Sequence, residues 1–286
     1  MKIAITGGSG FIGRNLTEQL TARGDSVSNV SLRGPLAPET FSGCDVVIHL
    51  AGEPVAQRWT SAARQRIMDS RVNGTRAVVN ALAGLAVKPE ILISASAVGI
   101  YGGRSGLRGD EQLSENATAA TDFLGQVATA WEREARAAEK FGVRVVCPRI
   151  GVVLGKNGGA LQRMLLPYRL GVGGRLGSGN QWMSWIHIED LCRLLIFVID
   201  HPALVGPVNV TAPVPVTNAE FTRALAHALH RPAIFPVPAF ALHLLFGEMA
   251  QVLLEGQRVV PTAALAAGFE FHYKDIAAAL RNICVA

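Results

Sequence analysis

The chain of 286 residues is poor in charge, in aromatic residues and, above all, in lysine. Charged side chains make up 17% of it, against about a quarter in an average protein, whereas hydrophobic residues reach 49%. This balance excludes intrinsic disorder and predicts a large buried core. The four cysteines have no Cys-x-x-Cys spacing and no accompanying histidines, so the sequence indicates neither a disulfide framework nor a metal site.

Long apolar runs are also missing. The most apolar stretch, residues 239–254, contains His243 and Glu248 and is shorter than the roughly 20 residues that a membrane-spanning helix needs. The first residues, MKIAITGGSGFIG, have neither the apolar core nor the cleavage site of a signal peptide. We therefore expect a soluble cytoplasmic protein without a membrane partner. In such a protein, residues 239–254 are part of the core or form the interface of a homo-oligomer.

Basic residues outnumber acidic ones by 27 to 22, which gives a net charge of +5. Such an excess can reflect nucleic acid, an anionic membrane or an anionic small ligand as the partner. The arginines are spread along the chain and no nucleic-acid-binding module is recognisable. We therefore expect a small-molecule ligand and no nucleic acid.

Strand and helix patterns alternate over the first 150 residues. The expected strands are 2–6, 26–32, 44–50, 90–94 and 143–147, and the expected helices are 11–23, 64–85 and 122–140. This alternation predicts an α/β fold with a doubly wound parallel sheet of the Rossmann type, covered by helices on both faces. Several expected strands are apolar throughout, as is typical of strands covered on both faces.

Glycine becomes frequent after Arg149, with nine glycines among the 29 residues 151–179, around a helix expected at 160–170. A helix at 188–199, a strand at 207–210 and a helix at 218–229 with Asn218 as its N-cap follow. We expect a nucleotide-binding core over 1–155, with 186–229 interleaved into it. Residues 156–185 and 230–286 then form a smaller, mainly helical substrate lobe.

A glycine pattern joins the first expected strand to the first expected helix. Gly7, Gly10 and Gly13 form Gly-x-x-Gly-x-x-Gly, with Phe11 and Ile12 within the same turn. Glycines let the backbone turn tightly and approach a pyrophosphate, whose charge is favoured at a helix N-terminus. These five residues are therefore expected to hold a dinucleotide, with a glycine-rich turn that binds nothing as the alternative.

The end of the second expected strand indicates which dinucleotide. An NAD site usually has an acidic residue about 20 residues after the glycines, but here the strand ends Ser31-Leu32-Arg33. A guanidinium suits the 2′-phosphate of NADP(H) through charge-assisted hydrogen bonds. NADP(H) is favoured over NAD(H), unless Arg33 is an ordinary loop cation.

The third expected strand ends with small residues. Leu50, Ala51 and Gly52 would let the chain pass beside the adenosine or the phosphates, with a tight strand exit as the alternative. Glu53 follows directly, either as a group near the cofactor or as a solvated charge.

Longer motifs extend over essentially the whole chain. They include TGGSGFIG (6–13), HLAGEPV (49–55), SASAVGIYG (94–102), RIGVVLGKNGGAL (149–161), LGSGNQWMSWIHIEDL (176–191) and LLEGQRVVP (253–261). In these the chain resembles the extended short-chain dehydrogenase/reductase superfamily. It is most similar to the atypical branch of NAD-dependent epimerase/dehydratase, or nucleoside-diphosphate-sugar-epimerase-like, proteins with a C-terminal domain of unknown function. The resemblance implies a Rossmann domain, an interleaved substrate lobe and bound NADP(H), held in part by Ser31, Arg33, Leu50, Ala51 and Arg71.

The catalytic pair of that superfamily is missing from the sequence. Its hydride chemistry uses a tyrosine as acid or base and a lysine four residues later that lowers the pKa of the tyrosine. None of the three tyrosines here is followed at that spacing by a lysine. By the resemblance, Leu124 and Ala128 stand at the two positions, and neither can move a proton.

Three other residues are candidates for catalysis. Ser96 matches the superfamily serine that hydrogen-bonds a substrate, although a serine at a strand end can also be structural. Tyr101 is a substitute acid or a residue of the pocket wall. His187, within the run 181–190 that we expect to form an aromatic-walled pocket, is a general base or a tie between loop and helix.

Two functions remain open on the sequence. One is an NADP(H)-dependent oxidoreductase or epimerase that acts on an unknown small molecule with non-standard catalytic residues. The other is a non-catalytic NADP(H)-binding sensor or regulator. Some members of the family are described as cell-division inhibitors, which links this second function to cell division.

Overall fold

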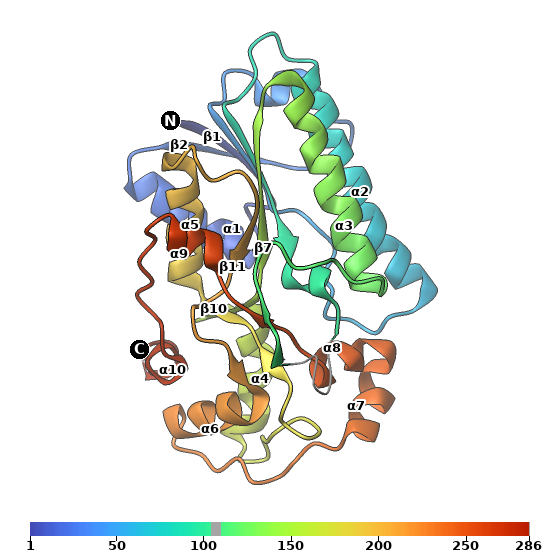
Figure 1. The fold of residues 1–286 in the computed structure, drawn as a ribbon, viewed down its shortest axis with the longest axis vertical. Coiled ribbons are helices and arrows are strands. Elements are labelled where there is room, and N and C mark those ends of the chain that lie inside the picture. The colour runs from blue at the N-terminus through green and yellow to red at the C-terminus, as the bar shows by residue number, and fades with distance from the viewer. Residues whose placement is uncertain (104–109, 286) are drawn as a thin grey trace.

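The computed structural model describes residues 1–103 and 110–285. At its centre a parallel sheet runs in the order β2, β1, β3, β4, β7 and β11, with β5 paired to β7 (Figure 1). The strands are β1 Lys2–Thr6, β2 Ser26–Val30, β3 Val46–His49, β4 Ile91–Ser94, β5 Ser96–Ala97, β7 Arg144–Ile150 and β11 Gly206–Val210. The parallel, Rossmann-type sheet predicted from the sequence is confirmed.

Helices cover both faces of the sheet because side chains alternate along each strand. Ile3 and Ile5 of β1 pack on one face with α1 Phe11–Ala22 and α5 Ile188–Asp200. Ala4, between them, packs on the other face with α2 Ser61–Ala83, beside which lies α3 Phe123–Arg136. Figure 1 shows the two helix layers on either side of the sheet.

One strand of the usual doubly wound order is missing. After β2 the chain forms only the 3₁₀ turn η1 Pro38–Phe41, within the described residues 31–45, before it enters β3 on the far side of β1. Consequently β2 is an edge strand, and the strand order reverses directly at β1. A crevice at the carboxyl ends of β1 and β3 is where doubly wound proteins bind ligands.

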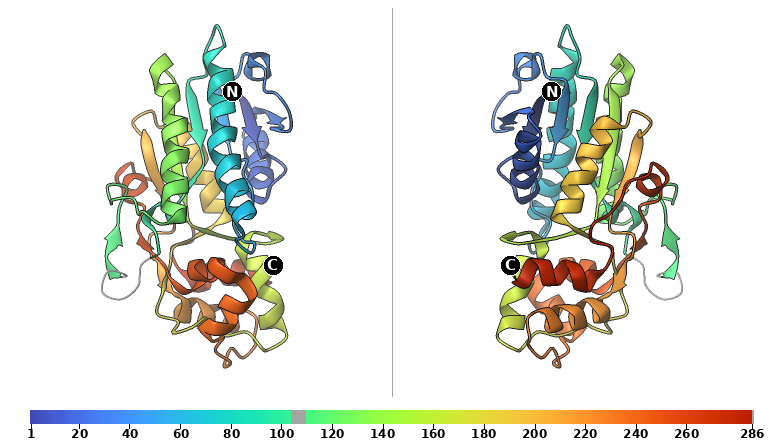
Figure 2. Two further views of the ribbon diagram at one scale, coloured as in Figure 1. Left: turned by 90° about the vertical axis from the view of Figure 1, so that its right-hand side faces the viewer. Right: turned by 90° about the vertical axis from the view of Figure 1, so that its left-hand side faces the viewer.

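A smaller lobe, whose longer elements are helices, lies beyond the carboxyl ends of the strands (Figures 1 and 2). Its helices are α4 Gly159–Arg169, α6 Asn218–Ala228, α7 Ala239–Phe246, α8 Ala250–Leu254 and α10 Ile276–Val285, with the turn η5 Gly247–Met249. Short strand pairs connect it to the core, namely β8 Val152–Gly155 with β10 Trp185–His187, β9 Trp182–Met183 with β12 Val216–Thr217, and β6 Gln112–Leu113 with β13 Arg258–Val259. The remaining elements are η2 Val98–Tyr101, η4 Ala137–Phe141 and α9 Thr262–Ala266.

The packing divides the chain differently from the expected division at two places. Helix α6 packs in the lobe, where Phe221 and Leu225 share a cluster with Leu161 and Leu280, although 186–229 was expected in the core. Conversely, Phe269 and the neighbouring α9 pack onto the core beside α5. Hydrophobic contacts between distant segments decide whether a helix belongs to the core or to the lobe. The order of the elements along the chain does not reveal these contacts.

The cap of α6 also differs from the expectation. Thr217, one residue before the expected Asn218, is the N-cap and forms a capping box with Glu220. The side chain of Asn218 instead accepts a hydrogen bond from Leu176 N at 2.8 Å. Over the two described ranges, no helix is long and apolar enough to cross a membrane.

Candidate functional site

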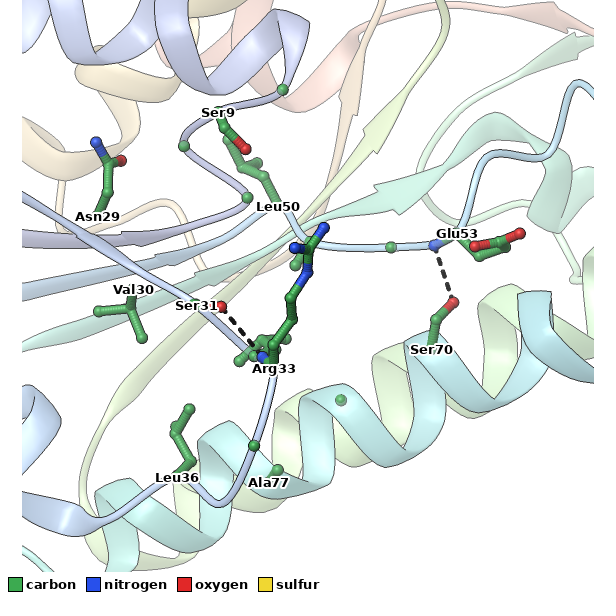
Figure 3. A pocket seen from close by; sticks show the side chains of 18 of the residues that line it. Ser9, Asn29, Val30, Ser31, Arg33, Leu36, Leu50, Glu53, Ser70 and Ala77 are labelled. Atoms are coloured by element: carbon green, nitrogen blue, oxygen red, sulfur yellow. Dashed lines mark hydrogen bonds between the residues drawn. The ribbon is translucent and has the colours of Figure 1, made fainter.

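A cleft of about 1150 Å³ opens at the carboxyl ends of β1, β2 and β3. We call it the first cleft, and Figure 3 shows most of the residues that line it. Its lining comprises Gly7, Gly8, Ser9, Gly10, Arg14, Asn29, Val30, Ser31, Leu32, Arg33, Gly34, Leu36, Leu50, Ala51, Gly52, Glu53, Asp69, Ser70, Asn73, Gly74 and Ala77. It therefore lies at the reversal point of the strand order, as the Rossmann pattern predicts.

The glycine turn leaves no room for side chains. Gly7 has φ +75°, and a Cβ there would lie 2.7 Å from Ala51 N. A Cβ on Gly13 would lie 2.4 Å from Gly7 O, so this glycine lets α1 pack against the turn. The backbone after β1 thus borders the cleft itself, and the Asn29 side chain lies against Gly8.

The amino end of α1 points its amides at this turn. Its N-cap is Gly10, and no side chain caps the helix, so the first backbone N–H groups are left for a ligand or water. The side chains of Phe11 and Ile12 point away into the core cluster. Any contribution of these two residues to a ligand must come from their backbone.

Cationic and polar side chains line the cleft at the end of β2. The guanidinium of Arg33 reaches into it, and the Ser31 hydroxyl accepts a hydrogen bond from Arg33 N at 3.2 Å (Figure 3). Across the cleft, Arg14 donates to Ser9 O at 2.7 Å and braces the glycine turn. This end of the cleft is suited to an anion.

A buried histidine supports the floor of the first cleft. His49, just before Leu50, bonds the hydroxyls of Thr6 at 2.6 Å and Thr75 at 3.0 Å. Burial, with a smaller contribution from the nearby charge of Arg71, lowers the pKa of His49 to about 4. The ring is therefore neutral near pH 7 and ties β1, β3 and α2 together.

Arg71 lies between the first cleft and a second one. Its Nη1 donates to Glu53 O at 3.0 Å and to Ile67 O at 3.3 Å, and burial lowers its pKa to about 10. Glu53 lines the first cleft, but Arg71 lines the second. The resemblance groups Arg71 with Ser31, Arg33, Leu50 and Ala51 as residues that hold the nucleotide. Those four line the first cleft, whereas Arg71 does not.

The second cleft, of about 270 Å³, lies between the core and the lobe. Its walls come from α3, the ends of β5, β7 and β9, α4 and α8. Leu124 and Ala128, which stand where the superfamily has its tyrosine and lysine, both line it. An isobutyl group and a methyl group therefore replace an acid and an ammonium at this wall.

Parts of two sequence motifs, 176–191 and 253–261, meet in the second cleft. Residues 181–184 of the expected run 181–190 form part of its wall, whereas Trp185 is buried and donates to Val214 O at 3.0 Å. The other part comes from Glu255, Gly256 and Gln257, and Gln257 donates to Gly102 O at 2.6 Å. The motif at 253–261 thus holds the lobe against the core.

Ser96 and Tyr101 lie in a buried polar network and line neither cleft. Ser96 donates to Glu132 Oε1 at 2.7 Å, and Glu132 forms an ion pair with Arg149 at 2.8 Å. Arg149 donates to the Tyr101 hydroxyl at 2.9 Å, which donates to Asn209 Oδ1 at 2.6 Å. Burial raises the pKa of Tyr101, so this hydroxyl keeps its proton. Both hydroxyls are thus hydrogen-bonded to other side chains of the protein, and the catalytic role considered for them stays a prediction.

His187 is the N-cap of α5. Its Nδ1 accepts from Glu189 N at 3.1 Å, and its ring stacks on Tyr273 at 3.8 Å. Burial lowers its pKa, and it lines neither cleft. This arrangement is the loop-to-helix tie, which was the structural alternative for this residue.

Sequence reasoning missed one wall of the first cleft. It consists of Asp69, Ser70, Asn73, Gly74 and Ala77 along α2. Their spacing of three and four residues marks a single helix face with small or polar side chains, and this was the available signal. Ser70 bonds Glu53 N at 3.0 Å and fixes the loop above the cleft (Figure 3).

A parallel sheet with this strand order, a glycine turn after its first strand and a crevice at its carboxyl edge defines the Rossmann class of α/β proteins. Within that class, residues 3–211 match the NAD dependent epimerase/dehydratase family, and residues 237–283 match a domain of unknown function, DUF1731. The chain belongs to this epimerase/dehydratase family, which confirms the resemblance inferred from the sequence.

Known proteins are similar to the chain over its whole length. The epimerase family protein YfhF of Bacillus subtilis is 40% identical over 99% of this chain and 98% of its own. The epimerase family protein Mb2239 of Mycobacterium bovis is 43% identical over 97% and 96%. The human epimerase family protein SDR39U1, whose crystal structure was solved with NADPH, is 34% identical in sequence. Its structure matches 100% of this chain and 99% of its own with a TM-score of 0.91.

Proposed function

We propose that the first cleft binds NADP(H). The observation that carries this proposal is the Arg33 guanidinium in a glycine-walled crevice at the point of strand reversal. An arginine at the end of the second strand suits a 2′-phosphate, whereas an acidic residue there would suit a free ribose hydroxyl. Human SDR39U1, which was crystallised with NADPH, supports the same cofactor.

The residues present suit such a dinucleotide. The glycine turn packs so closely on the segment after β3 and on α1 that a Cβ at Gly7 or Gly13 would meet backbone. The uncapped amides of α1 offer hydrogen bonds and partial positive charge. Gly7, Gly10 and the backbone of Phe11, Ile12 and Gly13 would hold the pyrophosphate. At the two sides of the cleft, Ser31 with Arg33 and Leu50, Ala51 and Gly52 would hold the adenosine part.

When bound, NADP(H) supplies hydride transfer through its nicotinamide ring. The second cleft, which adjoins the first at Arg71, would then receive the other reactant. We therefore propose an NADP(H)-dependent oxidoreductase or epimerase-like protein that acts on a small molecule. Leu124 and Ala128 exclude water from their wall but provide no proton, so the usual acid–base pair takes no part.

Leu124 and Ala128 also favour a second function, that of a non-catalytic NADP(H) sensor. With apolar groups at both positions, the chain suits a protein that binds NADP(H) and reports the redox state of the cofactor pool without rapid turnover. Ser96 and Tyr101 do not enter either proposal as catalytic residues, because their hydroxyls already bond other side chains. His187 does not enter either, because it lines neither cleft.

Calorimetric titration with NADPH and NADH tests the cofactor proposal. NADPH should bind more tightly, and Arg33→Ala should remove most of the difference, because one charge-assisted interaction contributes about 1.5–3 kcal/mol, or roughly 10- to 100-fold. Arg133→Ala, at an exposed arginine of α3, is the control and should keep the preference. Equal affinities of the unmodified protein for the two cofactors would overturn the proposal.

Cytoplasmic location, a homo-oligomer and the absence of nucleic acid as a partner stay predictions from the sequence.

A further inference from the structure

Few charged side chains line the second cleft. Among the described residues of its lining, they are Arg71 and Glu255. Arg71 stands at the border with the first cleft, where it contacts Glu53. Glu255 stands at another border, because it also lines a small outer pocket of about 180 Å³ beside Gly103. Charge is thus confined to the borders of the cleft.

Apolar side chains form most of the wall between these borders. Helix α3 presents Leu124, Val127 and Ala128, α4 presents Met164, and β9 presents Met183. Burial of an apolar ligand surface against such a wall stabilises binding by about 25 cal/mol per Å². A polar or charged ligand surface would instead lose its hydration there.

Two tryptophans in the lining are held in place by neighbouring groups. The Arg71 guanidinium lies 5.0 Å from the ring centre of Trp131. Trp182 is held by Arg258 at 4.5 Å from its ring centre and by a hydrogen bond from its Nε1 to Asp110 at 2.7 Å. Flat aromatic surfaces fixed in this way suit a ring-shaped ligand.

We infer that the second cleft binds a small, uncharged, mainly apolar ring compound with one carbonyl or hydroxyl group, and not a nucleoside diphosphate sugar. The inference rests on the proposed function, for which it names the substrate class. The polar group of the ligand lies at the Arg71 border, next to the cofactor cleft, and the ring lies among the apolar side chains.

Charge and size both argue against a nucleoside diphosphate sugar. Its diphosphate carries two negative charges, which need several cations or amides when they leave water. Arg71 is the single cation of the described lining, and Glu255 would repel the diphosphate. The volume of about 270 Å³ is below the range of about 300–1,000 Å³ of sites for drug-sized ligands.

Calorimetry on the full chain saturated with NADP⁺ tests the inference. The probes are acetophenone and 2-acetylnaphthalene, with UDP-glucose as the nucleoside diphosphate sugar. We expect both ketones to bind, the larger one more tightly, and no heat of binding from UDP-glucose up to millimolar concentration. Tighter binding of UDP-glucose than of either ketone would overturn the inference.

Variants locate the bound ketone. Val252→Trp, at a partly exposed position of the cleft lining, should weaken ketone binding at least tenfold. Val205→Trp, at an exposed valine outside the lining, should leave it unchanged. Phe240→Ser removes an apolar side chain that is exposed on α7 and should also have no effect. Unchanged binding in Val252→Trp, or a loss in Phe240→Ser, would show that the ketones bind elsewhere and overturn the inference.

A separate titration with NADPH keeps the two proposals apart. If NADPH binds but the ketones do not, the inference fails and the proposed cofactor site stands. If the apoprotein binds the ketones in a manner sensitive to Val252→Trp but binds no NADPH, the proposed function fails and the apolar ligand site stands.

Discussion

Single residues set the shape of the first cleft, and Gly7 does so most directly. Its φ of +75° is costly for any residue with a Cβ, and the atom would also lie 2.7 Å from Ala51 N. The turn and the segment after β3 can therefore lie this close only with glycine at position 7. One methyl group should separate the two halves of the cleft.

Gly7→Ala should abolish binding of NADPH or weaken it at least 100-fold. Gly24→Ala is the matched control, because Gly24 has a similar φ of +94° but nothing within 4 Å of an added Cβ. Both variants should lose about 1–2 kcal/mol of stability from backbone strain, and Gly7→Ala should lose more because its Cβ also meets the backbone of Ala51. Only Gly7→Ala should lose the cofactor. Titration of folded samples, checked by circular dichroism, measures this. Equal NADPH affinity in the two variants would contradict the proposed role of the glycine turn.

His49 makes the stability of the protein depend on pH. Its pKa is lowered to about 4 in the folded chain by burial, against about 6.5 in the unfolded chain. The unfolded state therefore binds the additional proton first, and the stabilisation is complete above pH 6.5 and declines as the pH falls towards 4. The free energy of unfolding should drop by about 1.4 kcal/mol per pH unit in this window, and by about 3 kcal/mol in all.

Urea unfolding at pH 7, 5.5 and 4.5 measures this contribution. His49→Asn should remove it and give a flatter curve than the unmodified protein, although Asn itself lowers stability at pH 7. His243→Asn, at an exposed histidine of α7, should keep the original slope. The same slope in His49→Asn as in the unmodified protein would show that another group is responsible.

At the scale of elements, side-chain caps decide where two of the helices, α2 and α6, begin. Helix α2 starts at Ser61, three residues before the expected start, because the Thr60 side chain accepts from Ala63 N at 3.1 Å. Helix α6 starts at Asn218 because Thr217 and Glu220 form a reciprocal capping box. In both cases a threonine satisfies amides that the helix itself leaves unpaired.

Thr217→Ala should lower the stability of the protein by about 1 kcal/mol. The lobe cluster that includes Phe221 and Leu225 should loosen first, because α6 carries both residues. Thr129→Ala, at an exposed position within α3, is the control and should raise stability slightly, because alanine favours helix interiors. Thermal unfolding measures both, and an unchanged midpoint in Thr217→Ala would show that the box contributes nothing.

Local patterns made the core of the fold and the first cleft predictable. The glycine turn and the small residues after β3 are sequence-local, and so is the change from strand to helix periodicity. The same is not true of Ser96 and Tyr101, because Glu132 and Arg149, which bind their hydroxyls, come from α3 and β7. A motif indicates where a side chain stands on its element, but not which distant group already occupies its polar atoms.

At the scale of the whole molecule, chemistry depends on how the lobe closes over the carboxyl ends of the strands. Arg64 of α2 forms an ion pair with Glu248 of η5 at 2.7 Å, and the Arg64 guanidinium stacks on Phe123 at 4.4 Å. Both charges are exposed, so this link contributes little to stability. The hydrogen bond from Gln257 to Gly102 O and the pairing of β13 with β6 therefore matter more for joining lobe and core than this ion pair does.

The wall of the second cleft sets the expected rate of any reaction. Without a proton donor at Leu124 and Ala128, turnover loses the roughly 10²- to 10⁴-fold that acid–base catalysis contributes. We expect NADPH oxidation with nucleotide sugars or carbonyl compounds at about 0.1 per second or less, compared with about 1–1000 per second for ordinary enzymes. Absorbance at 340 nm follows this reaction. A rate within the ordinary range would show that an unrecognised group supplies the proton.

Because no strand lies beyond β2, this strand forms an open edge of the sheet. This open edge is nevertheless a poor template for aggregation. Strand β2 is only five residues long and carries Ser26, Ser28 and Asn29 with largely exposed side chains. The opposite edge strand, β11, is also five residues long and has α9 packed beside it. Short, polar or covered edges resist pairing with another copy. Two copies at high concentration should therefore not continue the sheet from one molecule into the next.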